Sequence, residues 1–104
     1  MKQLFKIHAN ITLINKGGRT LPIKSGYRPG FSFIEKKQTS GSITLLNQDF
    51  LSVGESTDVE ILFFSDLLLG NINEKTTFNF FEGGLLVGFG NVITIDGWVD
   101  NQLS

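Results

Sequence analysis

Residues 5–14, with the sequence FKIHANITLI, alternate between apolar and polar side chains along almost their whole length. Successive side chains of a β-strand point to opposite faces, so Phe5 and Ile7 begin one face while Lys6 and His8 begin the other. A helix would scatter the same residues around its axis. The stretch therefore predicts a half-buried strand with one face turned toward a core.

Five further stretches show the same period of two. They comprise residues 28–34, 42–46, 58–64, 76–81 and 85–95. Turn residues separate them, above all Glu82-Gly83-Gly84, because paired glycines accept the positive φ of a tight hairpin. Gly88 and Gly90 lie in the last stretch, where glycine often marks a bulge or a barrel corner. The six short strands predict an all-β domain, either a small sandwich or a closed barrel.

The length and composition fit one small domain. The chain has 104 residues, and we expect the domain to occupy residues 1–95 and a C-terminal tail to occupy residues 96–104. It has no cysteine, which excludes disulfides and thiolate metal sites and fits a reducing compartment. Lys6, His8 and Asn10 interrupt any apolar stretch near the N-terminus, so no secretory signal is predicted. We therefore expect a cytoplasmic protein.

The order of the turn and aromatic residues is more specific than the alternation. The pattern consists of Gly17-Gly18-Arg19, Pro22, Gly26-Tyr27-Arg28-Pro29 with Phe31 and Phe33, Thr39-Ser40-Gly41-Ser42-Ile43-Thr44-Leu45, Glu82-Gly83-Gly84 and Val87-Gly88-Phe89-Gly90-Asn91-Val92. In order and spacing it resembles the C-terminal domain of bacterial elongation factor Tu, over nearly the whole chain. The resemblance implies a six-stranded antiparallel β-barrel.

The resemblance also implies a set of partners. In that family the barrel follows a GTPase domain and a second barrel, and it contacts the T-stem of aminoacyl-tRNA, elongation factor Ts and the GTPase domain. This sequence has no Gly-x-x-x-x-Gly-Lys-Ser/Thr loop for GTP. We therefore expect a bacterial, translation-related homologue that stands alone without the GTPase domain and retains a contact surface.

Four substitutions change that surface. The family's histidine after Gly-Gly-Arg is Thr20 here, and its arginine after the Phe-x-Phe pair is Ile34. The arginines on either side of Glu-Gly-Gly are Phe81 and Leu85. Each lost cation weakens binding to a nucleic-acid backbone. The substitutions therefore favour a protein partner over tRNA.

The predicted function is that of a non-catalytic module that binds a protein partner. The candidate interface consists of Leu67, Leu68, Leu69, Phe81 and Leu85. These residues are apolar, and they lie in a connection or beside a hairpin turn, where they could form an exposed patch. The alternative for residues 67–69 is a loop that folds over an open end of the barrel.

Two other functions remain open at this stage. One is an RNA-binding or tRNA-binding module, whose candidate contacts are Lys16, Arg19, Lys24, Arg28, Lys36 and Lys37. The formal net charge of −1 argues against it, because nucleic-acid binders usually carry a basic footprint. The other is self-association, in which the surface that faces other domains in the elongation factor would pair with a second copy.

Catalysis is not expected. His8 is the only histidine, and no serine or cysteine nucleophile pattern accompanies it. Asp58 and Glu60 share the outer face of a predicted strand, where they are expected to contact solvent. We predict no catalytic residue, no cofactor and no metal. The role of Trp98, in the expected tail, is left open.

Overall fold

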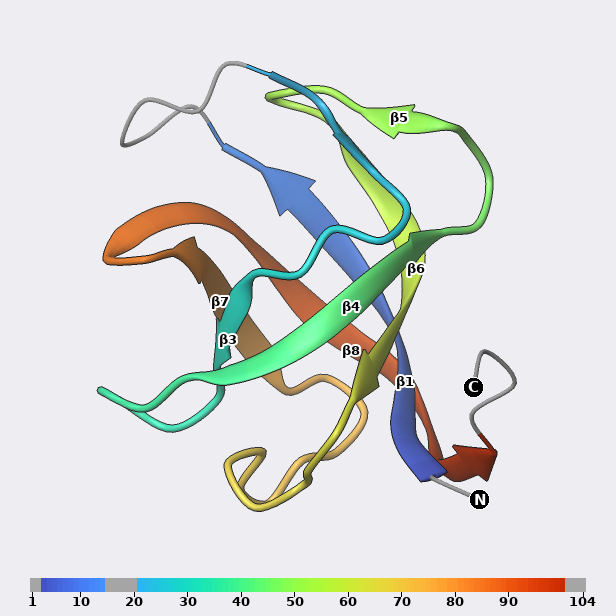
Figure 1. Ribbon diagram of the computed structural model, residues 1–104, viewed down its shortest axis with the longest axis vertical. Coiled ribbons are helices and arrows are strands. Elements are labelled where there is room, and N and C mark those ends of the chain that lie inside the picture. Colours follow the sequence, from blue (N-terminus) through green and yellow to red (C-terminus); the bar gives the residue numbers. More distant parts are fainter. Residues whose placement is uncertain (1–2, 15–20, 101–104) are drawn as a thin grey trace.

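The computed structural model describes residues 3–14 and 21–100 as an antiparallel β-barrel (Figure 1). The strands are β1 (Gln3–Leu13), β2 (Ile23–Lys24), β3 (Gly30–Ser32), β4 (Thr39–Leu45), β5 (Phe50–Leu51), β6 (Ser56–Phe63), β7 (Thr77–Glu82) and β8 (Leu85–Asp100). Six of them close in the order β1-β6-β4-β3-β7-β8, and β8 pairs with β1. The all-β class and the six-stranded antiparallel barrel are thus confirmed.

The alternation in sequence places one face of each strand inside the barrel. In β1 the residues Ile7, Ala9 and Ile11 are buried, and Ile7 lies opposite Ile61 of β6. Aromatic rings fill the centre of the core, where the rings of Phe31 and Phe63 meet edge to face with centroids 5.3 Å apart. The barrel interior is therefore a packed core lined by side chains.

The last strand extends beyond the expected domain end. Residues 96–100, which we expected in a tail, belong to β8 and pair with the beginning of β1. Phe5 lies opposite Trp98, and their rings meet edge to face at 5.4 Å. A strand can continue here because the register shifts by one residue at Ile93 and again at Asp96, and such bulges bend a strand around a barrel.

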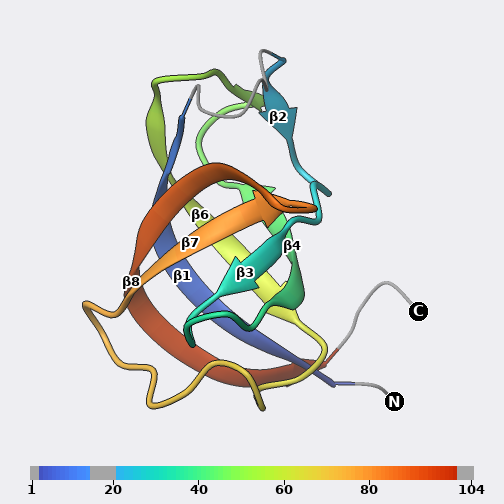
Figure 2. The ribbon, with the colours of Figure 1, turned by 90° about the vertical axis from the view of Figure 1, so that its left-hand side faces the viewer.

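A second, smaller sheet lies at one end of the barrel. It consists of β2 and β5, with Ile23 opposite Leu51 and Lys24 opposite Phe50. Figure 2 shows β2 beyond the end of the barrel, on the side toward which the β7–β8 hairpin points. This two-stranded ribbon was not expected from the sequence. Among the described residues no helix is long and apolar enough to cross a membrane.

Candidate functional site

The predicted interface residues fall into two groups at opposite ends of β7. Leu67, Leu68 and Leu69 lie in the β6–β7 connection, before β7 begins, whereas Phe81 and Leu85 lie at the β7–β8 turn. A strand rises about 3.3 Å per residue, so the length of β7 separates the groups by roughly 16 Å. Figure 2 shows the connection and the turn well apart. The five residues do not form one patch.

The two groups also differ in exposure. Leu69 is buried and belongs to the core cluster, so its assignment to an exposed interface was wrong. It packs inward because the connection folds against the barrel, which is the alternative that the sequence left open. Leu67 is exposed and Leu68 is half-buried. At the other end Leu85 is exposed and Phe81 is half-buried.

The candidate RNA contacts do not gather on one element. Lys16 and Arg19 lie outside the described residues. Lys24 is in β2, at the ribbon end of the barrel. The remaining three are Arg28 between β2 and β3, and Lys36 and Lys37 in the β3–β4 turn. The guanidinium of Arg28 stacks over the exposed ring of Phe64, 5.8 Å from its centroid.

The β2–β5 ribbon builds an apolar groove that sequence reasoning missed. Because side chains alternate along a strand, Ile23 and Leu51 point into the core while Lys24 and Phe50 point outward. The groove has a volume of about 410 Å³. Its lining residues are Leu21, Pro22, Ile23, Lys24, Tyr27 and Phe50.

Two large apolar side chains of the groove are open to solvent. Leu21 is 70% exposed and Phe50 is 56% exposed. Among the described residues, Lys24 is the one charged residue in the lining, and it forms no ion pair with the others. The groove therefore offers apolar surface beside a cation that has no counter-charge from those residues.

Backbone pairing fixes the wall that carries Tyr27. The Gly26 amide donates to the Ile43 carbonyl (2.8 Å), and the Ile43 amide donates to the Tyr27 carbonyl (2.9 Å). Gly26 adopts a φ of 98°, which glycine accepts without a Cβ clash. The Tyr27 hydroxyl donates to Glu82 Oε1 at 2.5 Å. This bond ties the groove to the β7–β8 turn, so the exposed Leu85 of the predicted interface lies on the neighbouring element.

A second, more polar pocket lies across β3 and β7. Its volume is about 360 Å³, and its lining residues are Ser32, Phe33, Glu35, Lys36, Thr77, Phe78, Asn79 and Phe81. It brings together one residue of each predicted set, Phe81 from the protein interface and Lys36 from the RNA contacts. Lys36 has a φ of 66°, a left-handed conformation uncommon for lysine.

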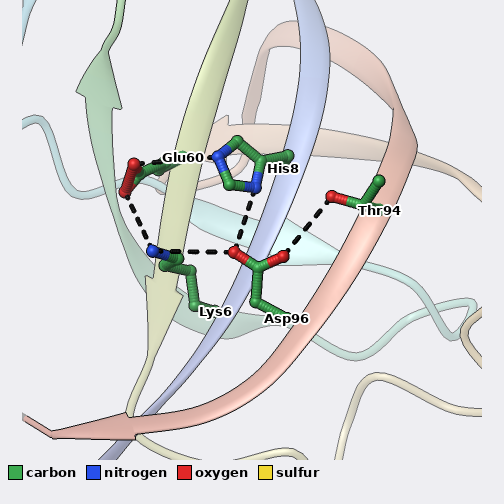
Figure 3. Close-up of polar contacts among 5 residues, drawn as sticks. All are labelled: Lys6, His8, Glu60, Thr94 and Asp96. Carbon is green, nitrogen blue, oxygen red and sulfur yellow. Dashed lines mark hydrogen bonds and ion pairs between the residues drawn. The ribbon is translucent and has the colours of Figure 1, made fainter.

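The single histidine belongs to a polar cluster on the outer face of β6, β1 and β8 (Figure 3). His8 Nδ1 lies 3.1 Å from Asp96 Oδ2, and His8 Nε2 lies 3.7 Å from Glu60 Oε1. Lys6 Nζ lies 3.6 Å from each of the two acids. The bulge at Asp96 turns its side chain toward β1. Each acid thus has two basic neighbours.

Two further hydrogen bonds involve the acids of this face. The Thr94 hydroxyl donates to Asp96 Oδ1 (3.4 Å). Asp58 accepts a hydrogen bond from Asn10 (3.0 Å), so the two acids of β6 have separate partners. Within residues 3–14 and 21–100, no group of three or more His, Cys, Asp or Glu side chains could hold a metal ion.

No family model matches the chain.

Proposed function

We propose that the protein is a non-catalytic binding module that engages a protein partner through the groove at the β2–β5 ribbon. One observation carries the proposal: two exposed apolar side chains, Leu21 and Phe50, line a groove with a volume of about 410 Å³. Exposed apolar surface that is concave is typical of binding sites. Because aromatic anchors dominate the energetics of many interfaces, Phe50 and Tyr27 are the residues we assign to the contact.

The resemblance to the C-terminal domain of elongation factor Tu suggests which kind of protein the partner is. A module of that kind in a bacterial cytoplasm would meet translation factors as partners. Leu85, which takes the place of an arginine in the family's pattern, is exposed in the β7–β8 hairpin, to which the Tyr27 hydroxyl is bonded through Glu82. The combination favours a partner related to translation.

Charge supports a protein partner over RNA. A protein that holds a nucleic-acid backbone neutralises several phosphates with several cations. Among the described residues the groove has Lys24 as its one cation, whereas Lys36 and Lys37 lie in the β3–β4 turn and the Arg28 guanidinium lies over the ring of Phe64. The walls of the groove are otherwise apolar or aromatic, apart from the Tyr27 hydroxyl.

A pull-down with matched variants tests the proposal. Tagged wild type, Phe50→Ser and Phe64→Ser are incubated with native lysate, with and without RNase. Phe50 and Phe64 are each 56% exposed, so the two variants remove the same side chain at equal exposure. We expect a protein that survives RNase and is lost only with Phe50→Ser. Retention of tRNA that RNase removes, or a partner lost equally with both variants, would contradict the proposal.

A further inference from the structure

We infer that the groove binds a segment of its partner in which an apolar side chain stands next to a carboxylate. The inference rests on the proposed function and specifies the chemistry of the partner. Two features of the groove carry it: its apolar walls and the position of Lys24, the one charged residue that the described part of the chain places in the lining.

The walls favour an apolar anchor. Leu21 and Phe50 provide most of the exposed apolar surface, and Tyr27 adds an aromatic ring whose hydroxyl is already bonded to Glu82. Burying an apolar side chain between them is favourable because it removes apolar surface from water. A polar anchor would find few hydrogen-bond partners along these walls.

The charge favours a neighbouring carboxylate. Lys24 lines the groove with no ion pair from the described residues, whereas Lys6 has two acidic neighbours. An opposite charge on the partner would complement Lys24, and complementary charges select partners and orient them. A second copy of this chain fits less well, because a two-fold interface repeats the same patch and would bring two Lys24 side chains into it.

Fluorescence anisotropy with labelled peptides tests the inference. The probe is a peptide of about eight residues that repeats Ser-Val-Ser-Glu, so that valine and glutamate face the same side when the chain is extended. Two control peptides replace glutamate by lysine or valine by serine. We expect the valine–glutamate peptide to bind at least about ten times more tightly than either control, a difference of about 1.4 kcal/mol.

Variants of the chain locate the binding. Lys24→Glu should reverse the preference between the acidic and basic peptides, whereas Lys37→Glu, an exposed lysine in the β3–β4 turn, should leave it unchanged. Phe50→Ser should weaken binding about tenfold and Phe64→Ser should not. Melting curves of both phenylalanine variants confirm that they fold.

Several outcomes would overturn the inference. Equal binding of the acidic and basic peptides would show that the groove does not recognise a carboxylate. A preference for the acidic peptide that Lys24→Glu leaves intact would show that Lys24 does not recognise it. A partner captured through Phe50 without any binding of the acidic peptide would overturn the inference while the proposed function stands. Light scattering that shows a dimer dissociated by Phe50→Ser would assign the groove to a second copy.

Discussion

Replacing Gly90 by alanine should disturb the pairing between β1 and β8 and destabilise the barrel. Gly90 is opposite Ile11 of β1 and Phe78 of β7, and it faces the core. A Cβ added there would lie 2.6 Å from the Asn10 carbonyl oxygen and 2.7 Å from Phe78 Cζ. Ordinary contacts begin at 3.4 Å, so the oxygen must retreat by about 0.8 Å and the ring by about 0.7 Å.

The cost follows from these displacements. Overpacking a dense core costs typically about 1–3 kcal/mol, and each stretched ladder hydrogen bond adds about 0.5–1.5 kcal/mol. Alanine returns about 0.4–1 kcal/mol by restricting the unfolded chain. We expect the free energy of unfolding to fall by about 3 kcal/mol. For a domain of this size that lowers Tm by roughly 12–24 °C.

Urea and thermal unfolding monitored by circular dichroism measure the change. Gly84→Ala is the matched control, because a Cβ at Gly84 meets nothing within 4 Å, and its stability should change by less than about 0.5 kcal/mol. The double variant Gly90→Ala, Phe78→Leu removes the clash of the added Cβ with the ring but leaves its clash with the Asn10 carbonyl oxygen. It should therefore be no more stable than Gly90→Ala. Equal stabilities of Gly90→Ala and Gly84→Ala would refute the reasoning.

Three smaller effects are expected elsewhere. Glu60→Gln weakens the cluster around His8 and should lower the free energy of unfolding by less than about 1 kcal/mol. Added salt should reduce this loss, and urea titrations at two ionic strengths measure it. Tyr27→Phe removes the hydroxyl bond to Glu82 and should cost about 1 kcal/mol, with faster amide exchange confined to the β7–β8 turn. Trp98→Ala removes the edge-to-face contact with Phe5 and should lower stability by at least about 0.5–1.5 kcal/mol in thermal unfolding, whereas a free tail would leave Tm unchanged.

The barrel strands could be predicted because each carries a pattern that is physically required. Ile7, Ala9 and Ile11 must share a face to enter the core, and the alternation in sequence shows this directly. The end of β8 could not be predicted in the same way. Its bulges at Ile93 and Asp96 reset the alternation, so the pattern breaks where the strand continues.

The groove could not be predicted for a related reason. β2 and β5 have two residues each, too few for a period to show. Leu21 and Phe50 lie far apart in sequence, and the pairing of Lys24 with Phe50 brings their surfaces together. Leu69 presents the opposite case, because an apolar run in a connection does not reveal which of its members turns inward.

The closure of the barrel limits where a partner can bind. Each of the six barrel strands pairs with a neighbour on both sides over part of its length, so the barrel offers less free strand edge than an open sheet of the same strands. Along these paired parts, binding to the barrel wall must use side chains, and on the face of β6, β1 and β8 the charges of Lys6, His8, Glu60 and Asp96 already face one another. The β2–β5 ribbon is different, because it has only two strands and carries exposed apolar groups beside Lys24. Surface of that kind gains most when another chain covers it, and this asymmetry is the physical reason for placing the binding site at the ribbon.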